Sequence, residues 1–154
     1  MFHIVLFEPE IPPNTGNIIR LCSNTGCELH LIEPLGFDMD DKKLRRAGLD
    51  YNEFASVKRY RDFSDYIEQA EPKRLFGLST HGKSSVYDTT FTAGDAFIFG
   101  PETRGLPKPL LSELGEEFVL RIPMKPDNRS LNLSNTAAIL VYEAWRQCGF
   151  DGGG

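Results

Sequence analysis

Three short segments of this sequence carry more polar chemistry than a connecting turn needs. The first is PEIPPNTGN, at residues 9–17, whose prolines stiffen a path that delivers Asn14, Asn17 and Arg20 to the start of a helix. Because Asn and Thr also cap many helices, capping by Asn14 or Thr15 explains this segment about as well as ligand binding does. The segment therefore offers amides and a cation for either purpose.

The second segment, FGPETRGLP at residues 99–107, combines glycines with charged side chains. Gly100 and Gly105 permit a close backbone approach, while Glu102 and Arg104 are presented on a proline-braced turn. The GxxxxGK[ST] and GxGxxG patterns are both missing, so this is not a phosphate-binding loop of those types. Charged residues between glycines also occur in plain turns, but this density favours a functional loop.

The third segment, IPMKPDNRSLNLSN at residues 122–135, is rich in hydroxyl and amide groups. Ser130, Asn132, Ser134 and Asn135 can hold a neutral, hydrogen-bonding ligand such as a nucleoside. Helix capping by Ser134 or Asn135 explains only one or two of these side chains. The surplus indicates a binding site.

Other kinds of site have weaker support. His3, His30 and His81 are widely separated in the sequence, so we expect no metal site. A GxSxG nucleophile elbow is missing, and both Ser79 beside His81 and the serines at 84–85 are interpreted as loop residues.

The elements that position the three segments alternate between short apolar runs and helical patterns. The predicted strands are residues 2–7, 29–32, 56–60, 75–80, 96–100 and 118–124. The predicted helices run from 14 or 15 to 26, from 38 or 40 to 47 with Gly48 as the stop, from a Ser64 cap to 70, from 107 to 114, and from a Ser134 or Asn135 cap to 149. In the last helix we expect Ala138, Val141, Tyr142 and Trp145 to share one face.

This order of elements predicts an α/β fold with a mostly parallel sheet flanked by helices. We expect one domain at residues 1–150, with a flexible glycine-rich tail at 151–154. In such sheets ligands bind where loops leave the carboxyl ends of strands, and each polar segment follows a predicted strand. The three segments are therefore expected to meet at one edge.

Composition limits the possible partners and compartments. Of the 154 residues 40% are hydrophobic, yet no apolar stretch approaches the ~20 residues of a bilayer span. Three cysteines, an odd number without a CxxC pair, indicate reduced thiols and a cytoplasmic protein. The net charge of −5 argues against a nucleic-acid partner, but four basic residues cluster at 42–46 and others lie in loops. That cluster is either a solvated helix face or an RNA contact.

The three segments together resemble the SPOUT methyltransferases, and the resemblance covers nearly the whole chain. It extends through HIVLFEPEIPPNTGNIIRLCSNTG at 3–26 and VYEAWRQ at 141–147. Within this class the sequence, including RRAGLDY at 45–51, is similar to the minimal tRNA (cytidine or uridine 2′-O) methyltransferases that modify the wobble nucleotide.

The resemblance implies an activity, partners and a topology. It implies transfer of a methyl group from S-adenosyl-L-methionine to the ribose 2′-hydroxyl of the wobble nucleotide of tRNA. It also implies a C-terminal deep trefoil knot, and a homodimer whose active site draws on both subunits. Two alternatives stay open: 2′-O-methylation of ribosomal RNA, and a non-catalytic nucleotide- or RNA-binding α/β module.

The resemblance also implies roles for individual residues. Catalytic and substrate-positioning roles fall on Arg20, Asn17, Glu102, Asn132 and Asn135. The cofactor pocket is expected to use Leu78, Gly100, Ile122, Met124, Ser130 and Leu131, and the substrate contacts are expected to be Tyr142, Arg104 and Arg129. A guanidinium, with a pKa above about 12, is a poor base, so we interpret Arg20 as an electrostatic organiser. Whether Glu102 orients Arg20 or offsets a sulfonium charge is left open.

Overall fold

The computed structural model describes residues 1–45 and 51–154, and for residues 45 and 51 it describes the backbone alone. Part of the basic cluster at 42–46, most of the RRAGLDY segment and the predicted end of the second helix lie outside the described residues. Among the described residues no helix is long and apolar enough to cross a membrane.

A seven-stranded sheet with the order β3-β2-β1-β6-β4-β7-β5 forms the centre of the molecule, and all of its neighbouring strands pair in parallel. The strands are β1 His3–Phe7, β2 Glu28–Ile32, β3 Lys58–Tyr60, β4 Leu75–Leu78, β5 Ser84–Ser85, β6 Ala96–Phe99 and β7 Val119–Arg121. The helices are α1 Pro12–Thr25, α2 Lys42–Arg45, α3 Tyr51–Ala55, α4 Phe63–Ala70, α5 Lys108–Leu114 and α6 Leu133–Gln147, with short 3-10 turns at Val86–Asp88 and Glu116–Phe118. The predicted α/β sheet is confirmed. The interpretation of Ser84 and Ser85 as loop residues is wrong, because they form the short strand β5 and pair with β7.

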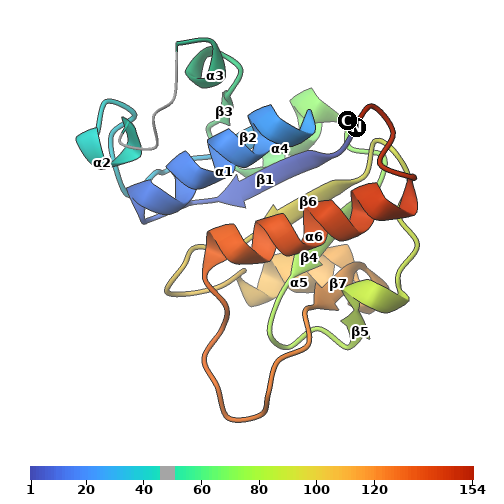
Figure 1. Ribbon diagram of the computed structural model, residues 1–154. Helices are drawn as coiled ribbons and strands as arrows, with labels where there is room; N and C mark the ends of the chain where they lie inside the picture. Colours follow the sequence, from blue (N-terminus) through green and yellow to red (C-terminus); the bar gives the residue numbers. More distant parts are fainter. Residues whose placement is uncertain (46–50) are drawn as a thin grey trace.

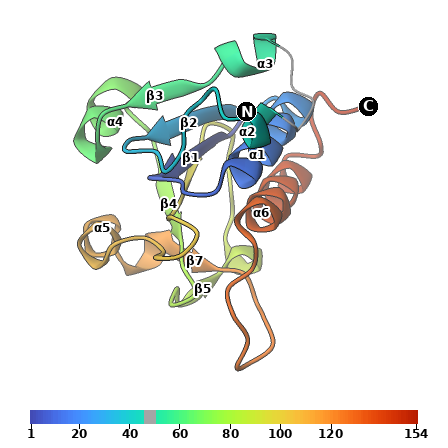
Figure 2. The ribbon, with the colours of Figure 1, turned by 90° about the vertical axis from the view of Figure 1, so that its left-hand side faces the viewer.

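Helices cover both faces of the sheet. Helices α1 and α6 lie on one face, and α4 and α5 lie on the other (Figures 1 and 2). Along β1, Ile4 and Leu6 belong to the cluster on the α1 and α6 side, whereas Val5 packs with Tyr66 of α4 and Leu110 of α5. Because both faces are buried at the centre of the sheet, strands β4 and β6 are continuous apolar runs, whereas the outermost strands β3 and β5 are polar.

The predicted start of α1 is wrong. Ile11 is the N-cap residue, and prolines fill the first two helical positions, where a missing N–H costs nothing. Asn14 and Thr15, which we expected to cap the helix, lie inside it and are buried. The Asn14 side chain is therefore available for contacts outside its own helix.

Two other predicted caps are displaced for a common reason. Helix α6 is capped by Asn132, and helix α4 by Asp62. The residues that we expected as caps, Ser134 or Asn135 and Ser64, lie in the first turn of each helix, where their backbone N–H groups are still free to bond to an earlier side chain.

The buried face of α6 also differs from the prediction. It consists of Leu133, Ala137, Leu140, Val141 and Ala144, at the three- and four-residue spacing of a helix. Of the predicted face only Val141 is fully buried, and Tyr142 is 45% exposed. At the end of α6, the indole Nε1 of Trp145 donates to the carbonyl of Asp151 at 2.9 Å. Asp151 is the first residue of the predicted flexible tail, and the flexibility of this tail stays a prediction.

Candidate active site

The three polar segments lie at the same edge of the sheet. In the register of the strands, Leu78 at the end of β4 is opposite both Phe99 of β6 and Leu120 of β7. The segments that follow β6 and β7 therefore leave the same end of the sheet on either side of β4, and the segment after β1 leaves it beside that of β6.

The carboxylate of Glu102 joins the second segment to the first. Its Oε1 accepts from the backbone N–H of Glu10 at 2.8 Å, and its Oε2 accepts from that of Ile11 at 2.8 Å. The amide of Asn14 donates to Oε2 at 3.3 Å. Glu102 thus holds the turn before α1 in place.

The first segment holds the second in return. The carboxylate of Glu10 accepts from the backbone N–H of Thr103 at 2.9 Å and from its hydroxyl at 2.7 Å. These two hydrogen bonds hold the pKa of the Glu10 carboxyl below its ordinary value. Arg104 Nη2 lies 3.2 Å from an oxygen of Glu8 and its Nε 3.6 Å from one of Glu10. Each of the two segments therefore accepts hydrogen bonds from the other.

Asn14 connects all three segments, although the family resemblance implies no role for it. Its Nδ2 donates to Glu102, while its Oδ1 accepts from Nδ2 of Asn132 at 3.1 Å. The side chain is buried, with 6% of the residue exposed. The signal that could have found it is the Pro-Pro pair before it, because a helix that starts on prolines needs no Asn cap two residues later.

Asn132 has two roles at the start of α6. Its Oδ1 accepts from the N–H and the hydroxyl of Ser134, at 2.9 and 2.6 Å, and from the N–H of Asn135 at 3.4 Å. Its Nδ2 is the group that reaches Asn14. Asn132 therefore fixes the end of the third segment against the first.

The two remaining catalytic candidates on α1 lie one and two turns beyond Asn14. Asn17 is exposed, and the Nε of Arg20 lies 3.3 Å from an oxygen of Glu53 on α3. The Arg20 side chain is 43% exposed, so a cation is presented near the surface beside the polar edge. Asn135, the last candidate, is exposed in the first turn of α6.

Some of the expected cofactor residues lie at the ends of β4, β6 and β7, and others lie in the loop after β7. Leu78 is buried and Ile122 and Met124 are partly buried, whereas Ser130 and Leu131 are exposed in the loop that projects from the sheet between β7 and α6 (Figure 1). At Gly100 an added Cβ would lie 2.3 Å from the backbone carbon of Gly105. Apolar side chains and loop backbone groups suit the neutral, flat part of a nucleoside.

The expected substrate contacts are exposed on different elements. Tyr142 is on α6, Arg104 is in the second segment and Arg129 is in the third. Two exposed cations beside a polar edge suit a phosphate-bearing ligand.

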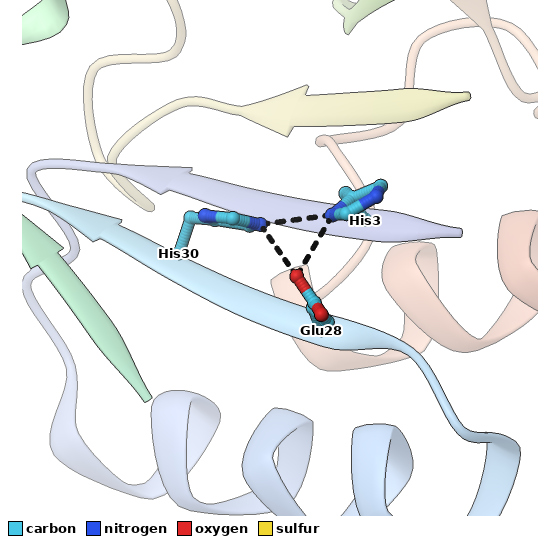
Figure 3. Close-up of side chains that lie close together, drawn as sticks. All are labelled: His3, Glu28 and His30. Carbon is cyan, nitrogen blue, oxygen red and sulfur yellow. Dashed lines mark hydrogen bonds and ion pairs between the residues drawn. The ribbon is translucent and has the colours of Figure 1, made fainter. Parts of the chain in front are cut away.

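Two of the three histidines that are widely separated in the sequence lie side by side in the structure. Parallel pairing places His3 opposite Glu28 and Val5 opposite His30, so the two histidine side chains lie on the same face of the sheet (Figure 3). Their ring nitrogens Nδ1 of His3 and Nε2 of His30 are 3.0 Å apart. Burial lowers the pKa of His30 to about 4 and also lowers that of His3, so both rings are neutral near pH 7.

A parallel α/β sheet with a polar edge built from three loops defines a class of ligand-binding α/β proteins, in which fold alone does not select an activity. The model of the SpoU rRNA methylase family matches residues 1–142, and the chain belongs to this family.

Relatives and solved structures match the whole chain. It is 60% identical over 152 residues to a tRNA (cytidine(34)-2′-O)-methyltransferase of Saccharophagus degradans, covering 99% of both chains. A solved structure described as giving structural insights into the 2-OH methylation of C/U34 on tRNA aligns with a TM-score of 0.89 and 43% identity, over 97% of both chains. The SpoU methyltransferase AviRb of Streptomyces viridochromogenes, in complex with AdoMet, aligns with a TM-score of 0.83 and 26% identity over 99% of this chain and 58% of that one.

Proposed function

We propose that this chain methylates the ribose 2′-hydroxyl of nucleotide 34 of tRNA, a cytidine or uridine at the wobble position, with S-adenosyl-L-methionine as the methyl donor. The observation that carries the proposal is the connection of three loops through Glu102, Asn14 and Asn132, in a chain that matches tRNA (cytidine(34)-2′-O)-methyltransferases over its full length.

The residues at the polar edge suit this cofactor. Leu78, Ile122 and Met124 with the backbone around Gly100 would hold the adenosine part, which needs a flat apolar slot and few hydrogen bonds. S-adenosyl-L-methionine supplies an electrophilic methyl carbon bound to a positively charged sulfur. The AdoMet complex of AviRb supports the same cofactor here.

The chain's main contribution to the reaction is alignment. The ribose oxygen forms a bond to the methyl carbon as the carbon–sulfur bond breaks, the sulfur keeps the electron pair, and the hydroxyl proton leaves to water. The hydrogen bonds between the loops hold the residues of this edge in place. This matters because a small misplacement of the oxygen lowers the reaction rate. Arg20 stabilises negative charge that develops on the oxygen, and it stays protonated because a guanidinium is a poor base at neutral pH.

A trefoil knot in the C-terminal half is part of the proposal, and the position of β7 supports it. In the sheet β7 lies between β4 and β5, although only residues 79–83 join those two strands. This joining loop is tight: Ser79 N–H donates to the Leu120 carbonyl at 2.9 Å, and a Cβ at Gly82 would lie 2.6 Å from the same oxygen. A strand inserted between two strands that are consecutive in the chain is the arrangement expected if the C-terminal segment passes through an earlier loop.

A homodimer is also part of the proposal. On the outer side of α6, Tyr142 and Trp145 have ring centroids 5.6 Å apart, and Trp145 and Phe150 have theirs 5.4 Å apart. Tyr142 and Phe150 are 45% and 44% exposed, and aromatic side chains are enriched at interfaces. Light scattering should give twice the chain mass of 17.3 kDa, and the mass of one chain would contradict the dimer.

A cytoplasmic location completes the proposal. Cys22, Cys27 and Cys148 are free thiols, as is usual for proteins of reducing compartments, and tRNA is a cytoplasmic substrate.

The test is to incubate the purified chain with S-adenosyl-L-methionine labelled in the methyl group and total tRNA, and then to map the labelled nucleotide. We expect label on the 2′-oxygen of nucleotide 34, and none on ribosomal RNA incubated in parallel. Label in ribosomal RNA alone would mean that ribosomal RNA, and not tRNA, is the substrate. Binding of S-adenosylhomocysteine without transfer to either RNA would favour the non-catalytic module.

A further inference from the structure

A second cluster of polar side chains lies at the opposite edge of the sheet, where β1 and β2 begin. Nδ1 of His3 lies 3.0 Å from Nε2 of His30 and 3.3 Å from Oε2 of Glu28, and the third side of this triangle, from His30 to Glu28, is 3.8 Å (Figure 3). Around a tetrahedral ion with bonds of about 2.0–2.1 Å, neighbouring ligand atoms lie about 3.3 Å apart. The triangle has the size of one face of such a site.

The types of the three ligand atoms also favour a particular class of metal ion. Two imidazole nitrogens and one carboxylate oxygen are ligands that Zn²⁺ and similar divalent transition metals accept. The three atoms lie within 4.8 Å of one another and come from adjacent strands, so little backbone movement is needed. Three protein ligands leave the fourth position to water.

The far side of His30 is held as in many metal-ligating histidines. Its Nδ1 lies 2.7 Å from the hydroxyl of the buried Tyr60, which leaves Nε2 facing the cluster. Tyr66 packs edge-on against the same ring, with centroids 5.5 Å apart. The imidazole is therefore fixed in orientation before any ion binds.

The cluster is closed on one side and open on the other. The side chain of His30 is 3% exposed, whereas those of His3 and Glu28 are 33% and 50% exposed, so an ion and its water have access. Lys58 Nζ lies 3.2 Å from Glu28 and competes for the carboxylate. Its side chain is 55% exposed and can turn into solvent.

We propose that His3, Glu28 and His30 form a binding site for one Zn²⁺-class ion, which clamps β1 to β2 at the amino edge of the sheet. Binding requires the hydrogen between the two rings to move to the ring nitrogen that faces away from the ion, so that both imidazoles bind as neutral ligands. The site lies across the sheet from the three loops, so the proposal does not depend on methyl transfer.

The experiment uses the full chain, free of any histidine tag and stripped with a chelator. Zn²⁺ binding is measured by competition with a chromophoric chelator, and the geometry is probed by the visible absorption of bound Co²⁺. We expect one Zn²⁺ per chain, and a Co²⁺ spectrum typical of four ligands. The melting temperature should rise with Zn²⁺ concentration, because the ion binds the folded state.

Four variants separate the site from other effects. His3→Gln and Glu28→Gln each remove one ligand from the exposed side and should weaken Zn²⁺ binding at least about 10-fold. Tyr60→Phe keeps the ring and removes only the hydroxyl behind His30, and about a 10-fold loss is expected. His81→Gln, at an exposed histidine elsewhere, is the matched control and should bind as the parent does.

The outcomes are decisive in either direction. Parent-like Zn²⁺ affinity in both His3→Gln and Glu28→Gln, loss of binding in His81→Gln, or a parent chain that binds no Zn²⁺ would overturn the proposal. Melting of the metal-free variants at the parent's temperature shows that lost binding is not lost folding. Should His3→Gln fail to fold, Glu28→Gln, whose side chain is half exposed, decides the question alone.

Discussion

The polar clusters at the carboxyl and amino edges of the sheet are formed by different parts of the chain. At the carboxyl edge, carboxylates and amides on loops bond to one another and to backbone N–H groups, as Glu102 does with Glu10 and Ile11. At the amino edge, side chains that start on strands meet directly, as His3, Glu28 and His30 do. Loops can vary their side chains without disturbing the core, so the carboxyl edge suits substrate chemistry and the amino edge suits stability.

This contrast predicts that substitutions at the carboxyl edge reduce activity and that substitutions at the amino edge reduce stability. The largest expected effect is on activity. Arg20→Ala removes the cation proposed to stabilise the developing oxyanion, and the rate of tRNA methylation should fall about 10²- to 10³-fold, as when a single transition-state contact is lost. Initial rates with labelled methyl donor and saturating tRNA measure this.

The control for Arg20 is binding of the cofactor product. S-adenosylhomocysteine should bind Arg20→Ala as tightly as it binds the parent chain, measured by calorimetry. A parallel loss of binding and rate would mean that Arg20, with its partner Glu53, maintains the fold of α1 and α3 instead of serving the reaction.

The second prediction concerns the backbone of the carboxyl edge. Gly100→Ala places a Cβ 2.3 Å from the backbone of Gly105, so the loop has to open, at a cost of about 2–4 kcal/mol in the free energy of unfolding. Urea denaturation measures the change. Gly154→Ala, where a Cβ would meet nothing within 4 Å, is the matched control. A stable Gly100→Ala chain with full activity would show that the loop's close approach is dispensable.

The fold could largely be predicted from the sequence, because burial of both faces makes the central strands β1, β4 and β6 mainly apolar runs between helical patterns, whereas the polar strand β5 gave no such pattern. Helix starts were less predictable. Asn14, Ser64 and Ser134 are good caps by residue type, but each lies inside its helix, since Ile11, Asp62 and Asn132 precede them. Capping depends on where the chain turns, and tertiary contacts decide that.

The predictability of a site depends on which edge it occupies. The carboxyl edge is assembled from contiguous segments, so its segments could be found by composition, and only the bond partners of Glu102 and Asn14 required coordinates. The amino edge is assembled by strand register. His3 and His30 are 27 residues apart, and no linear pattern shows that β1 and β2 pair so as to bring them together.

The third prediction tests whether Asn14 holds the three loops together. Asn14→Ala removes the amide that bonds to Glu102 and Asn132, leaving their polar groups partly unsatisfied, and should lower the free energy of unfolding by about 1–3 kcal/mol. Methylation should fall as well, since the loops lose their alignment. Asn24→Ala, at an exposed amide of the same helix, should change neither quantity. If both variants had the stability and activity of the parent, Asn14 would not be needed to hold the three loops together.

The fourth prediction concerns stability at the amino edge. Arg74 donates to the buried carboxylate of Asp95 at 2.9 and 2.6 Å, so Arg74→Ala leaves that carboxylate without its cation. Because the Arg74 side chain is 38% exposed, water screens part of the loss, and about 1–2 kcal/mol of stability is expected to go. Methylation per folded molecule should not change. Lys83→Ala, which breaks the ion pair with Glu116 in which both side chains are exposed, is the control and should melt as the parent does.

The smallest expected effect concerns tRNA affinity, at a basic surface outside both edges. Lys42 and Lys43 are exposed on α2, which packs against α1, the helix that carries Arg20. If they contact tRNA phosphates, changing both to Gln should lower tRNA affinity and reduce the slope of log affinity against log salt by about 1 to 2. Affinity for S-adenosylhomocysteine should stay constant. Lys73→Gln, at an exposed lysine between α4 and β4, is the control. An unchanged salt slope in the double variant would show that this helix face is solvated and does not contact tRNA.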